Sequence, residues 1–399
     1  MSISISLESI KRRLLPLDFN NLLSAARRET GLKYSVEQRF EESLRVLIDS
    51  CNADAHLSLI GQIAARQHFL ELFENRFRLI DYWQRKPEIM EQTIRSQIFI
   101  TGLPKSGSTF LHRLLAHDFN NRVPRMWEVM FPLPSPKWLS SDVDARIKKA
   151  DSRLRWLRWI HPAIAHAHPI GALIPHECGA ILGYSFESNV FLDMFSIPSY
   201  EVWLRSRDMH PAYDFHLSFL KHLQWQCPAE RWVLKSSDHV HALATLIQRY
   251  PEARIIFLHR DPIKVLQAAS SQMMLLKSLF SRSINPHLLG AYEARSLYDK
   301  VRKIMEFRDN YSYLEGHFMD VRCLDLASDP VGTVRTIYDR FGLTLSMENE
   351  ARMKAFATTE RNKRRSDRFT LADFTLDLEQ EDPRFYLYCE RFGVGREVL

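Results

Sequence analysis

The spacing of apolar residues along the chain changes at about residue 96. Before that point glycines are few, and apolar residues recur at helical intervals. In the segment RFEESLRVLIDSC, for example, Phe40, Leu44, Leu47 and Ile48 fall on one stripe of a helix. We therefore expect residues 1–95 to form a helical region that packs on the rest of the chain.

After residue 96, short apolar runs alternate with helical patterns. SQIFIT (96–101) predicts a buried strand, and the loop Gly102–Gly107 leads from it into a helix. RWVLKS (231–236) and ARIIFLH (253–259) predict two more strands, which flank a helix in DHVHALATLIQRY. Asp238 is the expected N-cap of that helix, and Pro251 its end. A unit of this kind favours parallel strands.

A third unit completes the pattern. Residues 291–308 have the spacing of an amphipathic helix, and HFMDVRCL that of a strand. SDPVGTVRTIYDRFG predicts a helix with Asp329 as its cap, Pro330 in its first turn and Gly342 at its end. Alternating strands and helices indicate an α/β protein with three layers around a central parallel sheet. We divide the chain into the helical extension 1–95, the α/β core 96–345 and a C-terminal extension 346–399.

Composition narrows the function only slightly. The 399 residues carry a net charge of +6, which favours anionic ligands but is too weak to indicate nucleic-acid binding. The five cysteines have no metal or redox spacing and argue for a reducing compartment. No uncharged apolar run reaches the roughly 18 residues of a membrane span. We expect a cytoplasmic protein without a transmembrane segment.

The loop Gly102–Gly107 has the context of a phosphate loop, because it joins a predicted strand to a predicted helix. Loop amides ahead of a helix N-terminus form an anion site, since unpaired N–H groups and the helix dipole converge there. The expected donors are Ser106, Gly107, Ser108 and Thr109. In nucleotide triphosphatases a lysine follows the second glycine. Here Ser108 takes that place, and Lys105 lies inside the loop.

The metal ligand of a triphosphatase site is also replaced. The strand 253–259 ends in HRDP, so Arg260 stands where a metal carboxylate is expected and competes for Asp261. A site with a lysine, an arginine and no clear metal ligand suits the transfer of a group less negative than phosphoryl, such as sulfuryl. A small-molecule kinase is the alternative, and it requires Mg²⁺ and a lysine after Gly107.

Three stretches carry a family resemblance through their order and spacing: GLPKSGSTFLHRLL, WVLKSSDH and YPEARIIFLHRDP. They resemble the sulfotransferases that use 3′-phosphoadenosine-5′-phosphosulfate (PAPS), in particular the bacterial-type branch, and the likeness covers most of the chain. It implies that the loop holds the 5′-phosphosulfate, with Lys105 stabilising the charge that develops there and Ser106–Thr109 cradling the phosphate. It also implies that Arg260 binds the 3′-phosphate, that the product is 3′-phosphoadenosine 5′-phosphate (PAP), and that no metal takes part.

Two places depart from the family pattern. Ala268 stands where a serine commonly assists the 3′-phosphate, and Ser270 and Ser271 are the nearby substitutes. RNKRRSD has the charge of the family's C-terminal nucleotide loop, in Lys363 and Arg364, but lacks its glycine. The Ala268 departure supports a third hypothesis, in which the protein binds nucleotide without transferring a group.

Transfer to a hydroxyl needs a base near the acceptor oxygen. Glu128 lies 23 residues after Lys105. In several sulfotransferase branches, the glutamate that acts as the base follows the loop at a similar separation. The alternative role of Glu128 is a structural ion pair. His239 follows the carboxyl end of the second predicted strand, where active sites of open sheets collect. Glu177 is a lone carboxylate in an apolar stretch, which continues toward Phe186 and Phe191 as pocket wall or as plain core.

The sequence thus predicts a P-loop-containing α/β enzyme that transfers a sulfuryl group from PAPS to a hydroxyl of a small, apolar acceptor by in-line attack. We expect no nucleic-acid partner. A homodimer is a further expectation.

Overall fold

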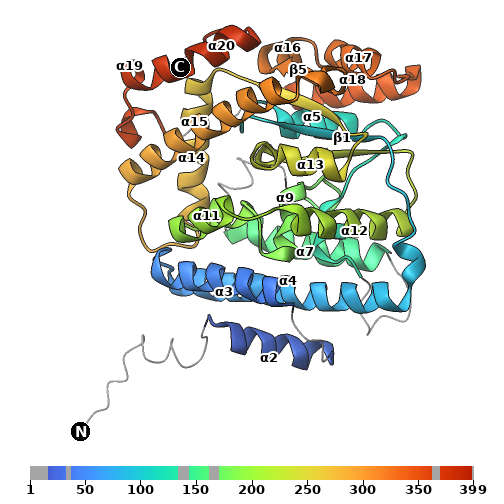
Figure 1. Ribbon diagram of the computed structural model, residues 1–399, viewed down its shortest axis with the longest axis vertical. Helices are drawn as coiled ribbons and strands as arrows, with labels where there is room; N and C mark the ends of the chain where they lie inside the picture. The colour runs from blue at the N-terminus through green and yellow to red at the C-terminus, as the bar shows by residue number, and fades with distance from the viewer. Residues whose placement is uncertain (1–16, 33–36, 134–142, 161–169, 362–368, 398–399) are drawn as a thin grey trace.

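Five parallel strands form the centre of the molecule. The computed structural model describes residues 17–32, 37–133, 143–160, 170–361 and 369–397. The strand order is β2-β3-β1-β4-β5 (Figure 1). The strands are β1 (Gln97–Gly102), β2 (Asn121–Arg122), β3 (Arg231–Lys235), β4 (Arg254–His259) and β5 (Phe318–Arg322). All four neighbouring pairs are parallel, as the alternating pattern predicted.

Alternate residues of the central strands enter two separate apolar cores. Ile98 and Ile100 of β1 belong to one core, whereas Phe99 belongs to the other. The first core is closed by α5 (Ser108–Leu115), α17 (Pro330–Arg340) and α18 (Met347–Arg361). The second includes residues of α13 (Leu243–Arg249), α14 (Pro262–Lys277) and α15 (Pro286–Asn310). Both faces of the sheet are therefore covered, which explains the continuous apolar runs of the central strands.

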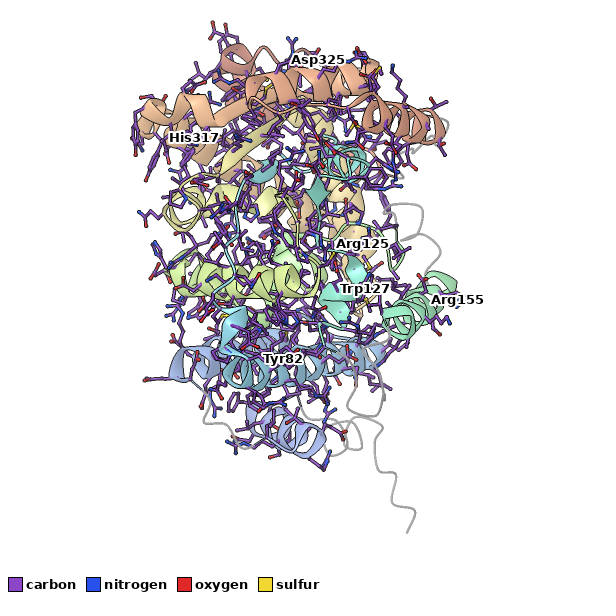
Figure 2. All side chains as sticks on the ribbon, turned by 90° about the vertical axis from the view of Figure 1, so that its right-hand side faces the viewer. Tyr82, Arg125, Trp127, Arg155, His317 and Asp325 are labelled. Carbon is purple, nitrogen blue, oxygen red and sulfur yellow. The ribbon has the colours of Figure 1, made fainter. Side chains whose placement is uncertain are left out.

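The N-terminal helices extend the second core away from the sheet. They are α2 (Phe19–Thr30), α3 (Gln38–Ala53) and α4 (Leu59–Arg85), and in Figure 1 they lie at the end opposite the C-terminal helices. The predicted stripe of Phe40, Leu44, Leu47 and Ile48 is buried in that core, as expected. Seen from the side, Tyr82 of α4, Trp127 of α6 (Met126–Met130) and Asp325 of α16 (Cys323–Ser328) follow one another toward the sheet and beyond it (Figure 2).

The remaining helices fill the space between these layers and complete the C-terminal part. They are α7 (Val143–Ile160), α9 (Cys178–Leu182), α10 (Val190–Met194), α11 (Pro198–Arg205), α12 (His210–Gln226), α19 (Leu378–Glu381) and α20 (Tyr386–Phe392), with the 3-10 turns η1 (Pro87–Ile89), η2 (Gly183–Ser185), η3 (Ser237–His241), η4 (Ser312–His317), η5 (Ala372–Phe374) and η6 (Asp382–Phe385). Among the described residues, no helix combines the length and apolarity that a bilayer crossing requires.

One predicted helix is divided, and its expected cap is wrong. The segment after β3 forms η3 and then α13, with a non-helical residue, Ala242, between them. The cap of η3 is Ser236, whose hydroxyl accepts the Asp238 amide at 3.2 Å. The Asp238 carboxylate pairs instead with Lys300 Nζ at 3.0 Å. The carboxylate that the local sequence predicted as a helix cap is therefore paired with a lysine distant in the chain.

The other predicted helix signals are confirmed. The Asp329 carboxylate accepts the Gly332 amide at 2.9 Å, and Pro330 is the first residue of α17. Gly342 follows the end of α17 with φ of 64°, in the left-handed region that glycine favours.

Candidate active site

The carboxyl ends of β1, β3 and β4 meet at one edge of the sheet. In the register of the sheet, Ile100 of β1 is the partner of Lys235 on β3, and Gly102 is the partner of Leu258 on β4. The loop after β1, Lys235 and Arg260 are consequently neighbours. Ligands of open α/β sheets bind outside this edge, so the sheet itself brings the candidate residues together.

The loop Leu103–Gly107 has a constrained backbone. Gly102 has φ of 114° and Gly107 has φ of 94°, and Lys105 is left-handed with φ of 59°. A non-glycine residue in this region carries strain that the surrounding structure must support, and such strain gathers at ligand sites. The Ser106 hydroxyl is buried and donates to the Leu103 carbonyl, so it holds the loop closed on itself.

The helix α5 begins at Ser108, directly after the loop. The first amides of a helix have no partner within the helix, and together with the dipole they attract an anion. Gly107 is the N-cap, and no side chain caps the amides of the first turn. The predicted anion donors therefore stand at a helix N-terminus that is open toward the sheet edge.

Lys235 is a second lysine at the loop, and the sequence analysis missed its role. It is the last residue of β3, and its side chain is 4% exposed. Its Nζ donates to Thr109 Oγ1 at 3.0 Å and to the Glu177 carboxylate. The signal was the lysine at the carboxyl end of the predicted strand 231–236. Two lysines therefore belong to the loop region, one within the loop and one on the neighbouring strand.

Arg260 joins the loop from the other side. It follows β4, and its Nη1 donates to the Lys105 carbonyl at 2.7 Å. The neighbouring Asp261 is occupied elsewhere: its carboxylate caps α14 by accepting the Ile263 amide at 3.0 Å, and it also accepts the Glu397 amide at 2.9 Å. The Asp261 carboxylate therefore binds backbone amides, while the Arg260 guanidinium lies beside the loop.

Glu128 is enclosed in a structural network. Its carboxylate accepts from Arg122 Nη1 at 3.0 Å, from Arg122 Nη2, and from the Arg125 amide at 2.8 Å, at the start of α6. Its side chain is 6% exposed. This arrangement matches the ion-pair alternative, because the oxygens that a base would use are already bound.

Glu177 has the opposite surroundings. It is the N-cap of α9, and 41% of its side chain is exposed. Its carboxylate binds Lys235, which in turn binds Thr109 of α5. Of the three candidate bases, Glu177 alone combines direct contact with Lys235 and access from solvent.

His239 lies behind this edge, inside the protein. It is 1% exposed, and its Nδ1 shares a hydrogen bond with the Tyr213 hydroxyl at 2.6 Å. Burial lowers the pKa of His239 to about 4, so the ring is neutral at neutral pH. A base with this pKa and no exposed surface is a poor partner for an acceptor that arrives from solvent.

The remaining candidates lie in three different settings. Phe186 and Phe191 are fully buried with Phe40 and Phe69 in the aromatic core, where they expose nothing to an acceptor. Ser270 is fully buried within α14. Lys363 and Arg364 lie outside the described residues.

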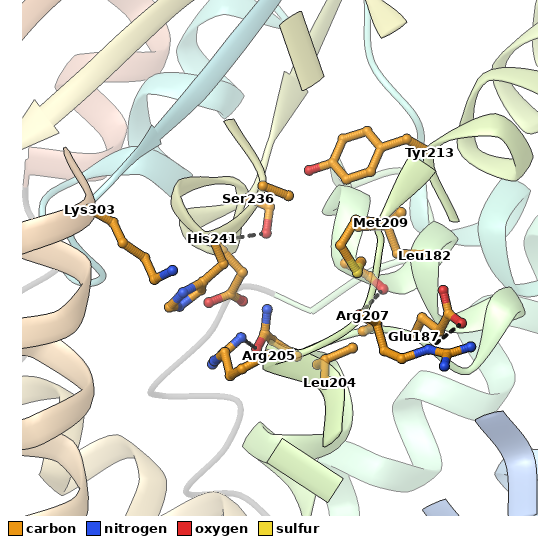
Figure 3. Close-up of a pocket in the computed structure, with 15 residues that line it drawn as sticks. Leu182, Glu187, Leu204, Arg205, Arg207, Met209, Tyr213, Ser236, His241 and Lys303 are labelled. Carbon is orange, nitrogen blue, oxygen red and sulfur yellow. Dashed lines mark hydrogen bonds and ion pairs between the residues drawn. The ribbon is translucent and has the colours of Figure 1, made fainter. Parts of the chain in front are cut away.

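A separate polar pocket lies beyond the end of β3. Ser236, His241, Arg205 and Lys303 are among its lining residues (Figure 3). Its volume is about 50 Å³, whereas pockets for drug-sized molecules occupy roughly 300–1,000 Å³. The pocket is too small to receive an acceptor of ordinary size. Elsewhere, the described part of the chain contains no group of three or more His, Cys, Asp or Glu residues that could hold a metal ion.

The fold and this sheet edge define a phosphate-loop α/β protein. Over residues 97–347 the chain matches the sequence model of the sulfotransferase family, and it therefore belongs to that family. This confirms the resemblance inferred from the three stretches of sequence.

Individual relatives add detail. The omega-hydroxy-beta-dihydromenaquinone-9 sulfotransferase Stf3 of Mycobacterium tuberculosis is 24% identical over 265 residues, which are 62% of each chain. Human carbohydrate sulfotransferase 2 is 35% identical over 94 residues, or 23% of this chain and 17% of that protein. The chain thus spans less than two thirds of the length of these curated relatives.

Two solved structures share the fold. Sulfotransferase STF1 of Mycobacterium tuberculosis superposes with a TM-score of 0.81 at 28% identity, covering 92% of this chain and 98% of that one. Sulfotransferase STF9 of Mycobacterium avium gives a TM-score of 0.84 at 23% identity over 96% and 100% of the two chains. The phosphate-loop fold with a central parallel sheet is thereby shown.

Proposed function

We propose that this protein transfers a sulfuryl group from PAPS to a hydroxyl group of a small, apolar acceptor. The observation that carries the proposal is the meeting of three basic residues, Lys105, Lys235 and Arg260, at one sheet edge beside the start of α5. PAPS presents anionic groups at its 5′ and 3′ positions. A loop with helix amides and lysines, and an arginine one hydrogen bond away, fit those two groups.

Each residue has a role that follows from its place. The α5 amides and the Thr109 hydroxyl orient the 5′ group, and Lys105 and Lys235 compensate its negative charge. Arg260 anchors the 3′-phosphate, since a guanidinium suits bidentate binding of phosphate. The bound donor supplies the sulfuryl group. Preorganised cations stabilise developing charge without reorganising during the reaction.

We assign the base to Glu177 in preference to Glu128 and His239. Its carboxylate reaches solvent and lies against Lys235, so an acceptor hydroxyl can approach it next to the loop. The neighbouring ammonium compensates its charge before the proton arrives. Glu128 and His239 are proposed as structural residues, because the Glu128 carboxylate is bound by Arg122 and a backbone amide, and His239 is buried with its Nδ1 bonded to the Tyr213 hydroxyl.

The apolar character of the acceptor rests on a relative. Stf3 is named for an omega-hydroxy-beta-dihydromenaquinone-9 substrate, and a hydroxyl on such a molecule is the kind of acceptor we propose here. For this chain the proposal names only a class of acceptor, a hydroxyl group on a small, apolar molecule. The cytoplasmic location and the homodimer stay predictions from the sequence.

A small-molecule kinase is the less favoured function. It would need a carboxylate for Mg²⁺ near the end of β4, but the Asp261 carboxylate is bound by the backbone amides of Ile263 and Glu397. Mg²⁺-dependent turnover of ATP would support this alternative. Binding of PAP without transfer to any of a broad panel of acceptors would support a protein that only binds nucleotide.

Calorimetric titration with PAP and with AMP tests the donor assignment, because the two ligands differ only in the 3′-phosphate. We expect PAP to bind at least about tenfold more tightly, which corresponds to one charge-assisted phosphate contact. Arg260→Ala should remove that preference and leave AMP binding unchanged. Lys105→Ala should weaken both ligands. Equal binding of PAP and AMP to the unmodified protein would sink the proposal.

Identification of the acceptor is a second experiment. PAPS with a labelled sulfuryl group is incubated with the protein and a cell extract, and the labelled product is identified by mass spectrometry. We expect a sulfate ester of an apolar hydroxyl compound. A labelled polar sugar would contradict the acceptor class but leave the transfer reaction standing.

A further inference from the structure

The chain folds back over the end of β4 after its last helix. α20 ends at Phe392, and the next residue, Gly393, is left-handed with φ of 60°. The Val394 amide then donates to the Cys389 carbonyl at 2.9 Å, and the Glu397 amide reaches the Asp261 carboxylate at 2.9 Å. We call residues 393–397 the C-terminal strap. It lies beside the residues that the proposed function assigns to the 3′-phosphate.

The strap places a carboxylate on Arg260. Arg260 Nε donates to the two Glu397 oxygens at 2.9 and 3.1 Å, and Nη2 donates at 2.8 Å. The Arg260 and Glu397 side chains are only 21% and 14% exposed. This is the bidentate geometry with which an arginine also binds a phosphate. Glu397 therefore occupies the groups with which Arg260 would bind a ligand.

A second arginine holds the other end of the strap. Arg322, the last residue of β5, donates from Nη1 to the Gly393 carbonyl at 3.4 Å. Between the strap and the strand ends lies a groove of about 280 Å³, lined by Arg260, Arg322, Cys323 and the strap itself. The groove opens directly beside the Arg260–Glu397 pair, so an incoming anion can reach the pair from it.

We propose that Glu397 is an intramolecular ligand of Arg260 which a 3′-phosphate displaces, so that the strap covers this subsite when it is empty and leaves it when nucleotide binds. The inference rests on the proposed function, which gives Arg260 its phosphate. A dianionic phosphate has more negative charge and more acceptor oxygens than one carboxylate, and it can therefore displace Glu397 from Arg260.

The backbone of the strap permits this movement. It contains two glycines in five residues, and a Cβ on Gly395 would meet no atom within 4 Å. The pair also has a role in the empty protein, because a partly buried guanidinium without a partner is unfavourable. Closure lowers the fraction of molecules ready to bind, and the apparent dissociation constant rises by the reciprocal of that fraction.

Charge removal on the strap tests the inference. Glu397→Gln keeps the shape of the side chain but removes the competing charge. We expect this variant to bind PAP about three- to tenfold more tightly and to bind AMP with unchanged affinity. A gain of this size follows if the strap is closed in about two-thirds to nine-tenths of the empty molecules and the substitution abolishes the closed state. The matched control is Glu390→Gln, which removes an exposed carboxylate from neighbouring α20 and should change neither ligand. Unchanged or weaker PAP binding by Glu397→Gln would overturn the inference.

Hydrogen exchange supplies an independent readout. The Val394 and Glu397 amides should exchange faster in the PAP complex than in the AMP complex, since their bonds to Cys389 and Asp261 are released with the strap. Equal or slower exchange with PAP would mean that the strap stays in place. A failure of Arg260→Ala to reduce PAP binding overturns the proposed function itself. If Arg260→Ala weakens PAP binding as expected but Glu397→Gln leaves it unchanged, only the inference about the strap is overturned.

Discussion

Glu177 and Glu128 show how strongly the surroundings decide the role of a carboxylate. Both are candidate bases in the sequence, yet one faces solvent beside Lys235 and the other is bound by Arg122 and a backbone amide. Removing a partner from a buried ion pair leaves an uncompensated charge. Loss of an exposed base affects the proton transfer instead.

We expect the two glutamine variants to separate accordingly. Glu177→Gln should lower the rate of labelled-sulfate transfer by about 100-fold or more in the folded fraction, and it should lower the urea midpoint less than Glu128→Gln does, because the Glu177 side chain is 41% exposed. Glu128→Gln should lower the free energy of unfolding by about 3 kcal/mol, because Arg122 is left unpaired, and reduce the rate less than about tenfold in the folded fraction. The opposite pattern would return the base to Glu128.

At the scale of the element, the turn from β1 into the loop depends on one glycine. Gly102 has φ of 114°, and a Cβ there would lie 2.3 Å from the Leu258 carbonyl oxygen of β4. Real Cβ atoms do not approach backbone oxygen so closely, and the conformation itself is open mainly to glycine. The packing of two parallel strands therefore requires glycine just where the phosphate loop begins.

Alanine substitution measures this requirement. Gly102→Ala should destabilise the protein by about 3 kcal/mol or more in urea denaturation, since backbone of β1 or β4 has to shift. Gly316→Ala is the matched control, because Gly316 is exposed and a Cβ there meets nothing within 4 Å; its effect should stay below about 1 kcal/mol. Similar effects of the two changes would show that β1 and β4 are not packed this closely.

At the scale of the whole molecule, several histidines are buried without charge. Burial lowers the pKa of His112 and His216 to about 3 and that of His222 and His239 to about 4. The unfolded chain binds protons at these sites below about pH 6.5, whereas the folded protein does not until the lower values are reached. Stability is therefore full above pH 6.5 and falls as the pH drops toward 4.

His112 allows the effect to be measured at one site. Its Nε2 donates to the Val233 carbonyl at 3.1 Å beneath the phosphate loop, and glutamine can keep a donor there without titrating. Between pH 6 and 5, His112→Gln should flatten the dependence of unfolding free energy on pH by about 1.4 kcal/mol per pH unit. An unchanged slope in His112→Gln would contradict the assignment of His112 as a neutral buried ring.

Apolar pattern and turn residues predicted the sheet because they act locally. The runs at β1, β3 and β4 are continuously apolar at their centres, as expected of strands covered on both faces. The strand ends, the intervening helices and the glycines then place the loop and Arg260 at one edge. Parallel topology follows from these units, and so the location of the candidate site was predictable.

What the sequence by itself determined is the order of these elements and the basic residues at their ends, since periodicity, caps and glycines are read within a few residues. Only the tertiary structure decided the partners: Lys235 with Glu177 and Thr109, Glu128 with Arg122, Phe186 and Phe191 in the core, and Glu397 on Arg260. Glu397 lies 137 positions from Arg260 in the chain. Such pairings depend on exposure and distance in the folded state, and no local pattern records either quantity.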